Sequence, residues 1–273
     1  MAKTILITGA SSGIGKATAA HFAKHGWNVV ATMRQPAEEH DLAAENVLVT
    51  RLDVLDDASI ASAVAEADAR FGGVDVLLNN AGYGAYGALE ATSMEVVRRQ
   101  FDVNLFGLVA VTKAVLPNMR AKRNGVIVNV SSVGGRMCYP LGALYHGSKW
   151  AVEGLSEALH YELAVLGIRV KLVEPGGVDT DFGGRSFVFT NDESLAEYQP
   201  MVSAMVSARE AMDTRTFQKP SGVAEVIWEA VHDPSARLRY VSGEGAKVLL
   251  EERFSLERDE AFLAAMRKRF GIA

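Results

Sequence analysis

Three side chains near the middle of the chain have the types and the spacing needed for proton transfer. Tyr145 and Lys149 stand four residues apart, and Ser132 lies thirteen residues before the tyrosine. A phenol has an ordinary pKa of ~10, so it donates a proton near neutral pH only when its anion is stabilised. Positions i and i+4 share one helix face, which lets the Lys149 ammonium favour the phenolate. Ser132 can donate a hydrogen bond to the same substrate oxygen, so the trio predicts a general acid.

A strand, a glycine-rich turn and a helix follow one another at the N-terminus. The apolar run 4–8 leads into GASSGIG at 9–15, where a helical pattern begins. Glycine lets the backbone approach a pyrophosphate closely, and a helix N-terminus adds partial positive charge. In this context G-x-x-x-G-x-G indicates a dinucleotide site, although a flexible loop with hydroxyl caps is the alternative. The residues expected to hold the phosphates are Gly9, Ser11, Ser12, Gly13, Ile14 and Gly15.

The end of the second apolar run bears on which nicotinamide dinucleotide this site prefers. A carboxylate there would bind the ribose 2′-hydroxyl of NAD, whereas an arginine accommodates the 2′-phosphate of NADP. The chain has Arg34 at this point and no acid, which favours NADP(H) over NAD(H). The alternative is a surface arginine that starts a loop. Asp53, at the end of the third run, could hold the adenine amino group or cap a helix.

The elements that must position these residues alternate along the chain. Apolar runs predict strands at 4–8, 28–33, 47–52, 74–78, 125–130 and 169–173. Helical patterns occupy 15–25, 56–71, 93–119 and the segment that carries Tyr145 and Lys149. The strands are apolar throughout instead of alternating, so helices are expected on both faces of the sheet. The pattern predicts an α/β fold, a single-domain Rossmann-type doubly wound parallel sheet over residues 1–273.

The alternation loosens after Pro175. Residues 181–219 contain short helical stretches rich in Met and Ala, and 183–219 are expected to form a helical substrate lid, because Met and Phe suit an adaptable apolar cover. Ordinary packing is the alternative for any single residue there. Ser221 is expected to cap a helix, 238–243 to form a last strand, and 244–273 to form a helical C-terminal extension.

Composition argues against several classes of partner. The net charge of −5 and the scattered Lys and Arg residues argue against nucleic acid and against an acidic membrane surface. The single cysteine excludes an internal disulfide and fits a reducing compartment. No metal site is expected, since only His21 and His25 have ligand spacing and that pair fits a solvated helix face. No apolar stretch approaches ~18 residues, so we expect a cytoplasmic protein.

Together these motifs resemble the short-chain dehydrogenase/reductase family in its single-domain form. The finer similarity is to the branch that contains 17β-hydroxysteroid and retinol dehydrogenases, and to bacterial carbonyl reductases. The resemblance implies an NAD(P)-dependent oxidoreductase that acts on CH–OH and C=O groups. The matching motifs are TGASSGIG at 8–15, LDV at 52–54, NNAG at 79–82, Asn104 in DVNLFG, VSS at 130–132, YHGSK at 145–149 and PGGVDT at 175–180.

The resemblance implies roles residue by residue. The catalytic set would be Asn104, Ser132, Tyr145 and Lys149, in which Asn104 holds a water next to the lysine. Without the family, Asn104 would be read as a mid-helix polar residue satisfied locally. Cofactor contacts beyond the glycine-rich turn would come from Arg34, Asp53, Val54, Asn80, Ala81, Gly82, Tyr145, Lys149, Pro175, Gly176, Val178 and Thr180.

Substrate contacts are expected from segments near the nicotinamide. The candidates are Tyr83, Tyr86, Met137, Cys138, Tyr139, Leu141 and Phe182. Their apolar and aromatic character predicts a bulky hydrophobic ketone or aldehyde, reduced with NADPH, or the matching secondary alcohol. Two alternatives stay open: an NAD-dependent alcohol or hydroxysteroid dehydrogenase working oxidatively, and a non-enzymatic NADP sensor. The helices at 93–119 and around Tyr145 have several apolar faces, and in the family such helices pair in homodimers or homotetramers.

Overall fold

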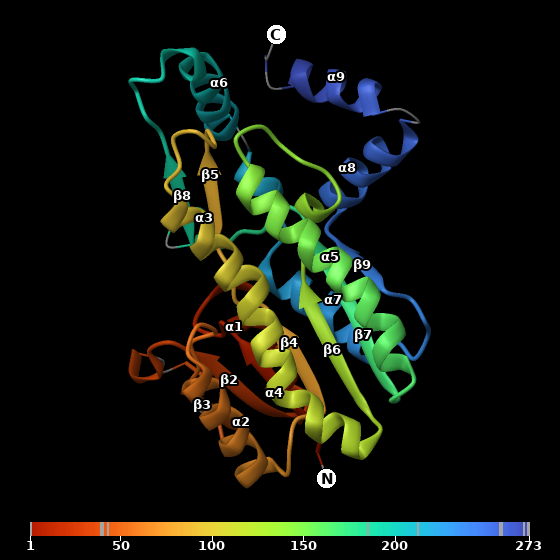
Figure 1. Ribbon diagram of the computed structural model, residues 1–273. Helices are drawn as coiled ribbons and strands as arrows, with labels where there is room; N and C mark the ends of the chain where they lie inside the picture. The colour runs from red at the N-terminus through yellow and green to blue at the C-terminus, as the bar shows by residue number, and fades with distance from the viewer. Residues whose placement is uncertain are drawn as a thin grey trace.

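Among the residues that the structure describes, seven parallel strands form the central sheet of this computed structural model (Figure 1). The described residues are 2–38, 41–42, 44–184, 186–211, 213–256, 259–269 and 271. The strand order reverses between β1 and β4, and ligands of such sheets bind at that reversal, beyond the carboxyl ends of the strands. In sheet order the strands are β3 (Val47–Arg51), β2 (Asn28–Met33), β1 (Thr4–Thr8), β4 (Val76–Asn79), β6 (Gly125–Val130), β7 (Ile168–Pro175) and β9 (Arg239–Ser242).

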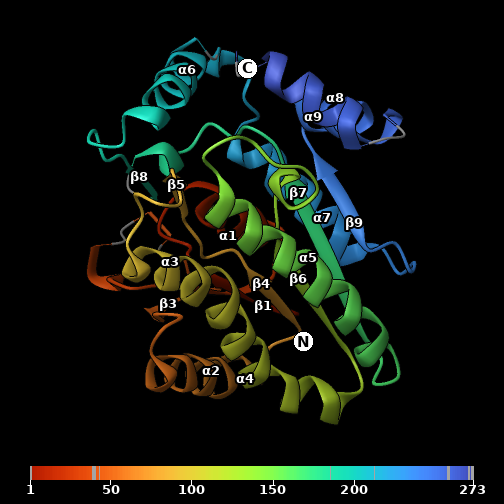
Figure 2. The same cartoon turned by 45° about the horizontal axis from the view of Figure 1, so that its top comes forward.

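Helices cover both faces of the sheet, as Figures 1 and 2 show. In β1, Ile5 and Ile7 join the core under α1 and α7, whereas Leu6 joins the core under α2 and α4. Burial on both faces explains why the strands are apolar throughout, and the prediction of a doubly wound parallel sheet is confirmed. The covering helices are α1 (Gly13–Lys24), α2 (Asp57–Phe71), α3 (Met94–Phe101), α4 (Gly107–Lys122), α5 (Ala143–Ala164) and α7 (Pro220–His232).

The prediction of one continuous helix over 93–119 is wrong in the middle of that range. Helix α3 ends at Phe101, a π-helical turn η2 (Asp102–Phe106) follows, and α4 continues from there. Asn104 lies in this turn with 3% of its surface exposed, and its side chain bonds to the backbone of Tyr83. Hydrophobic periodicity cannot reveal one wider turn inside a helical stretch.

A small parallel sheet of two described strands stands apart from the main one. It pairs β5 (Gly84–Gly87) with β8 (Phe187–Thr190), and places Tyr86 opposite Phe189 in the ladder. Figure 1 shows this pair beyond the carboxyl ends of the main strands, below α6. Neither strand is predicted from the sequence, because β5 is short and contains two glycines, which are poor strand formers.

The segment 183–219 is partly helical. Helix α6 (Gln199–Glu210) is its main element, and the Tyr198 hydroxyl donates to Glu90 Oε2 at 3.2 Å, which ties the start of α6 to the loop after β5. Residues 185 and 212 lie outside the described residues. The short helical turns are η1 (Pro36–Glu38), η3 (Val133–Gly135), η4 (Asp181–Gly183), η5 (Ala196–Tyr198) and η6 (Thr214–Thr216).

The C-terminal part corrects two expectations. Ser221 does not cap α7, because the helix starts at Pro220, whose fixed φ suits a first helical position, and Lys219 is the N-cap. The extension predicted as one helix is described as two, α8 (Glu244–Ser255) and α9 (Asp259–Arg269). They pack together with the loop after β6 through Met137, Leu250, Phe262 and Met266. In the described chain, no helix is long and apolar enough to cross a membrane.

Candidate active site

The glycine-rich turn is shaped to accept an anion. Gly9 and Gly13 have φ angles of +69° and +54°, which side-chain-bearing residues rarely adopt. A Cβ at Gly15 would lie 2.2 Å from the Gly9 carbonyl oxygen, so the third glycine lets α1 start directly against the turn. The Ser12 N-cap side chain makes no capping bond to any described residue. The first N–H groups of α1 thus remain available, and the turn fits a dinucleotide pyrophosphate.

Three motifs that are distant in the sequence meet at this turn. A Cβ at Gly9 would lie 3.0 Å from Ala81 Cα, and one at Gly13 would lie 3.1 Å from Thr180 Cγ2. Asn80 Nδ2 donates to Gly9 O at 3.1 Å and so fixes the turn against the end of β4. The structure therefore gives the Asn80 side chain a role in holding the turn, and its contact with the cofactor stays a prediction.

The residues predicted to bind the adenosine half lie beyond β2 and β3. Arg34 is exposed, one residue after β2 ends. Asp53 Oδ1 accepts from Leu55 N at 3.0 Å and closes a turn, while Asp56 supplies the side-chain cap of α2. Asp53 is therefore not a helix cap. Val54 packs against the first residue of α4.

Tyr145 and Ser132 meet at the far side of the reversal. Tyr145 lies in the first turn of α5 and Ser132 follows β6 closely, and both residues line the same pocket. Ser132 Oγ accepts from Gly134 N at 3.0 Å and donates to Pro175 O at 3.4 Å, a long bond that a substrate oxygen could replace. Burial raises the pKa of the Tyr145 phenol, and the Ser132 hydroxyl opposes that rise. The phenol is thereby held in its protonated form, which a general acid needs.

Lys149 lies where the helical spacing places it. Its Nζ donates to Val130 O at 2.9 Å and is 5.9 Å from the centroid of the Tyr145 ring. Burial lowers the pKa of Lys149 to about 8, and the Glu153 carboxylate opposes this. Burial is the dominant cause at Tyr145 and raises the pKa of its phenol, so the expected lowering of that pKa by Lys149 stays a prediction.

Asn104 and Gly82 lie next to the ammonium. Asn104 Oδ1 accepts from Tyr83 N at 3.0 Å, and its Nδ2 donates to Tyr83 O at 2.9 Å and to Ser148 Oγ at 3.1 Å. A Cβ at Gly82 would lie 3.1 Å from Asn104 Oδ1 and 3.9 Å from Lys149 Nζ. Glycine at 82 thus leaves space between the amide and the ammonium, and a water held there by Asn104 stays a prediction.

His146 holds the loop that follows η3, and sequence reasoning missed it. Its Nε2 accepts from Tyr139 N at 3.0 Å, which leaves Nδ1 to donate to Gly134 O at 2.9 Å. Burial lowers the pKa of His146 to about 4, so the ring is neutral at neutral pH. Leu141, in the same loop, has a φ of +58°, which is uncommon for a branched residue. The position of His146 next to Tyr145 in YHGSK does not reveal from the sequence that the ring bonds to the backbone of this loop.

Aromatic side chains enclose the Tyr145 ring. Tyr86 of β5 stacks on it with centroids 5.5 Å apart, and Phe187 of β8 stacks on Tyr86 at 5.2 Å. Phe182 meets Tyr145 edge-on at 5.9 Å. The Arg209 guanidinium of α6 lies 4.1 Å from the centroid of Phe187 and donates to Gly183 O. The small sheet therefore builds one aromatic wall of the site.

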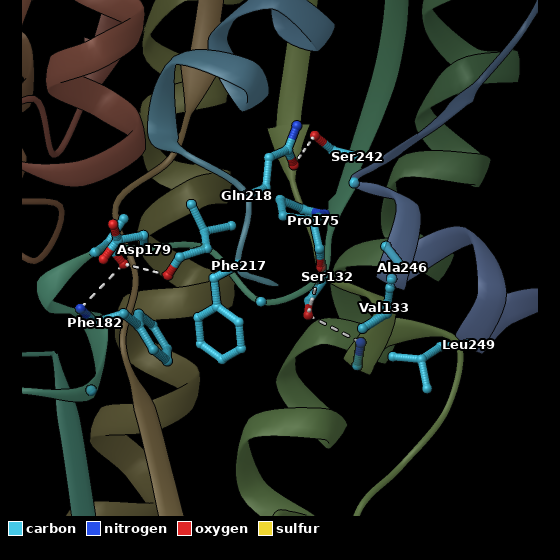
Figure 3. A pocket seen from close by; sticks show the side chains of 18 of the residues that line it. Ser132, Val133, Pro175, Asp179, Phe182, Phe217, Gln218, Ser242, Ala246 and Leu249 are labelled. Atoms are coloured by element: carbon cyan, nitrogen blue, oxygen red, sulfur yellow. Dashed lines mark hydrogen bonds between the residues drawn. The ribbon is translucent and has the colours of Figure 1, made fainter. Parts of the chain in front are cut away.

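This wall bounds a cavity of about 1990 Å³ that includes Ser132 and Tyr145 in its lining. Figure 3 shows the Ser132 side chain between Phe182 on one side and Leu249 of α8 on the other, with the Phe217 ring beside it. Ser242 Oγ donates to Gln218 Oε1 at 2.8 Å, and both residues line the cavity with Phe217. A cavity of this size and character can hold a large apolar molecule next to the phenol.

The structure supports only part of the predicted substrate set. Tyr139 and Phe182 line the cavity, together with Tyr86 and Leu141. Tyr83 and Cys138 are not among its lining residues, so the structure does not support them as substrate contacts. The Tyr83 ring lies 6.0 Å from the Arg99 guanidinium of α3, and Cys138 is exposed. Met137 is buried in the core under α8.

Comparisons with known proteins agree with this geometry. The family described as short chain dehydrogenase matches residues 3–188. An uncharacterised oxidoreductase of Schizosaccharomyces pombe is 40% identical over 246 residues, which cover 88% of this chain and 100% of that protein. Retinol dehydrogenase 8 of Homo sapiens is 36% identical over 255 residues, which cover 87% of this chain and 80% of that protein.

Two solved structures extend the comparison. A short-chain dehydrogenase from Streptomyces avermitilis superposes with a TM-score of 0.82 at 33% identity, covering 99% of this chain and 97% of that one. ElxO with NADP bound superposes with a TM-score of 0.73 at 26% identity, covering 91% and 100%. With the glycine-rich turn, the Ser132–Tyr145–Lys149 geometry and the parallel sheet in place, the chain belongs to the short-chain dehydrogenase family and is an NAD(P)-dependent oxidoreductase of CH–OH and C=O groups.

Proposed function

We propose that this protein is an NADP(H)-dependent carbonyl reductase of bulky hydrophobic ketones or aldehydes, which also oxidises the matching secondary alcohols. The observation that carries the proposal is the meeting of Ser132, Tyr145 and Lys149 at the edge of a large cavity with aromatic walls. A dinucleotide turn lies at the reversal of the same sheet. The site thus has room for a hydride donor and for a large acceptor side by side.

The chain's own groups act on the carbonyl oxygen. When bound, the nicotinamide supplies the hydride to the carbonyl carbon. Ser132 Oγ donates a hydrogen bond to the oxygen, which becomes more negative in the transition state, so this bond is strongest there. Tyr145 Oη donates the proton that turns the oxygen into a hydroxyl. The raised pKa of Tyr145 keeps that proton on the phenol until it is needed.

Lys149 and Asn104 support the proton transfer. The Lys149 ammonium stabilises the phenolate that remains after the proton has left, and it would bind the ribose hydroxyls of the cofactor. Asn104 lies across Gly82 from that ammonium, where a water could return the proton from solvent. The preference for reduction rests on Arg34, because the NADP pool of the cytoplasm, our proposed location, is kept reduced.

The cofactor would run along the reversal of the sheet. The turn from Gly9 to Gly15 and the N-terminus of α1 would hold the pyrophosphate, and Arg34 would bind the 2′-phosphate. Asp53 and Val54 would flank the adenine. The groups proposed around the nicotinamide and its ribose are Ala81, Gly82, Pro175, Gly176, Val178 and Thr180. The NADP-bound structure of ElxO supports a nicotinamide cofactor for this fold.

A hydrophobic substrate is favoured by the residues of the wall. Phe182, Phe187 and Phe217 line the cavity. Residues 183–219, which we propose as the lid, contribute three of the aromatic rings that line the cavity, those of Phe187, Phe189 and Phe217. We further propose a homodimer or homotetramer, because Trp150 and Tyr161 of α5 expose 47% and 69% of their surface. Sedimentation of the pure protein measures that state.

A substrate panel tests the function. The protein is mixed with NADPH or NADH and with decanal, benzaldehyde, acetophenone or a steroid ketone, and loss of reduced-nicotinamide absorbance is followed. We expect turnover with NADPH to exceed that with NADH and to favour the larger carbonyls. Faster oxidation of the alcohols with NAD would favour the oxidative dehydrogenase. Tight NADPH binding without turnover of any compound would favour the sensor.

A further inference from the structure

Four charged side chains that the proposed mechanism does not use gather behind the catalytic residues. Glu153 of α5 and Glu174 of β7 are buried, with side chains 5% and 0% exposed. Arg239 Nε of β9 lies 2.9 Å from Glu153 Oε2 and 3.5 Å from Glu174 Oε1. Arg136, which follows η3, lies 3.0 Å from Glu174 Oε1. The cluster joins three elements and the loop that begins at Ser132.

The carboxylates of this cluster are not fully satisfied. Glu153 Oε1 and Glu174 Oε2 are buried and bond to no group in the described part of the chain. Leaving a buried acceptor unpaired is costly, so such a group calls for an explanation. Burial, and next the Glu153 charge, raise the pKa of Glu174 to about 7. Near neutral pH, then, Glu174 is partly protonated.

Glu153 lies one helical turn beyond Lys149, on the same face of α5. The loop after Ser132 presses on the helix between the two residues, since a Cβ at Gly135 would lie 2.9 Å from Glu153 Cγ and 3.1 Å from Lys149 O. Lys149 Nζ donates to Val130 O at the end of β6. Both side chains are buried on this face of α5, so the charge of Glu153 acts on the ammonium through a medium of low dielectric.

We propose that Glu153 is a positioning residue, whose buried carboxylate keeps the Lys149 ammonium charged beside Tyr145. The expected effect on catalysis rests on the proposed function. The effect on the charge of Lys149 rests on the geometry of the cluster alone. A buried ammonium without a facing carboxylate loses its proton more easily than an exposed one. Without Glu153, Lys149 would be neutral at a pH where it must stabilise the phenolate.

The sign of the effect follows from the groups that face Glu153. Lys149 lies on one side of it, and Arg239 with Glu174 lies on the other. Arg136 neutralises Glu174 from the loop, and Glu157 binds Arg239 from the next turn of α5. A negative charge at 153 raises the pKa of Lys149, so its removal must lower it further below the ordinary value. The ammonium would then be lost at a lower pH.

Glu153→Gln removes the charge and keeps the shape. Arg239 retains Glu157 at 2.6 Å and Glu174 at 3.5 Å, so the variant is expected to fold. The protein is labelled with lysine carrying ¹³C at Cε, and the Lys149 resonance is assigned by its absence in Lys149→Arg. We expect the NMR titration midpoint, about 8 in the natural protein, to fall by about one unit in Glu153→Gln.

Glu157→Gln is the matched control, because it removes an exposed carboxylate from the same helix and the same arginine. Its Lys149 midpoint should equal that of the natural protein. Glu153→Asp keeps the negative charge on a shorter side chain, so its Lys149 midpoint should lie close to that of the natural protein. Equal midpoints in the natural protein and in folded Glu153→Gln would overturn the proposal, and so would a shift of the same size in Glu157→Gln.

Kinetics connect the electrostatics to the reaction. In the reduction of benzaldehyde by NADPH, kcat/KM falls as pH rises and the ammonium is lost. We expect that fall to move to lower pH in Glu153→Gln by the same amount as the NMR midpoint, and to stay in place in Glu157→Gln. If the natural protein reduces no carbonyl, the proposed function fails while the NMR titration still tests Glu153. Turnover with an unmoved pH profile would reject the role of Glu153 alone.

Discussion

The cofactor half and the substrate half of the site are built from different kinds of contact. At the cofactor half, glycines allow close approach: an added Cβ at Gly9 or Gly13 would lie 3.0–3.4 Å from atoms of Ala81 or Thr180, and one at Gly15 would lie 2.2 Å from Gly9 O. At the substrate half, side chains from β5, β8, η4 and the loop before α7 make the wall. The first half tolerates almost no added atom, whereas the second is defined by which rings are present. Mutations should therefore act differently on the two.

The largest effect should come from the residue that lies where the halves meet. Tyr145→Phe removes only the hydroxyl, and the ring keeps its contacts with Tyr86 and Phe182. We expect kcat for reduction to fall by about 10²–10⁴-fold, while NADPH binding is nearly unchanged. Stopped-flow turnover and quenching of protein fluorescence by NADPH measure the two quantities. A variant with full activity would remove Tyr145 from the mechanism.

The cofactor half should fail as a unit when one atom is added. Gly15→Ala places a Cβ 2.2 Å from the Gly9 carbonyl oxygen, so we expect destabilisation of about 1–3 kcal/mol and loss of NADPH binding. Gly154→Ala is the control, because no described atom outside its own helix lies within 4 Å of its Cβ position. That change should stabilise α5 by about 0.5–1 kcal/mol. Urea unfolding and calorimetric binding of NADPH compare the two variants.

A charge change at the edge of the cofactor half should alter selectivity and leave the fold intact. Arg34 is exposed and lies beyond β2, and Arg34→Asp would remove the proposed partner of the 2′-phosphate and supply one for the 2′-hydroxyl. We expect NADPH affinity to drop by about ten- to hundredfold and the ratio of NADH to NADPH activity to rise. Unchanged NADPH affinity would show that Arg34 does not bind the phosphate.

The smallest effect is expected in the substrate half. Phe187→Ala removes one ring of the wall, and the backbone pairing of β8 with β5 remains. We expect KM for a steroid ketone to rise by about three- to tenfold, and KM for benzaldehyde to change much less. Steady-state kinetics with both carbonyls test this. Equal changes for the two would mean that Phe187 packs the fold and does not contact large substrates.

The cofactor half and the substrate half also differ in how well the sequence predicts them. The strand at 4–8, the turn at 9–15 and the pair Tyr145–Lys149 depend on local patterns and fixed spacings, and the structure places each as expected. The β5–β8 pairing joins two short segments far apart in the chain, so no local pattern announces it. Which side of the backbone a ring occupies is also set by tertiary packing. For that reason Tyr139 lines the cavity and Tyr83 lies under Arg99.

Other features that the sequence does not predict also have specific physical causes. The π-helical turn at Asn104 changes hydrogen bonding without changing the apolar pattern around it. The role of His146 depends on a tautomer and on two backbone partners that only the folded loop provides. The rise in the pKa of Tyr145 depends on how deeply the ring is buried, which residue spacing cannot convey.

The ladder between β5 and β8 has a consequence for how this enzyme can diversify. Its register is kept by main-chain groups, as in the bond from Gly84 N to Ser186 O at 2.9 Å, and not by the rings that the strands carry. Homologous proteins can therefore differ in the side chains at 86, 187 and 189 while the backbone pairing of β5 with β8 is kept. Directed evolution toward new carbonyl compounds should begin with libraries at these three positions.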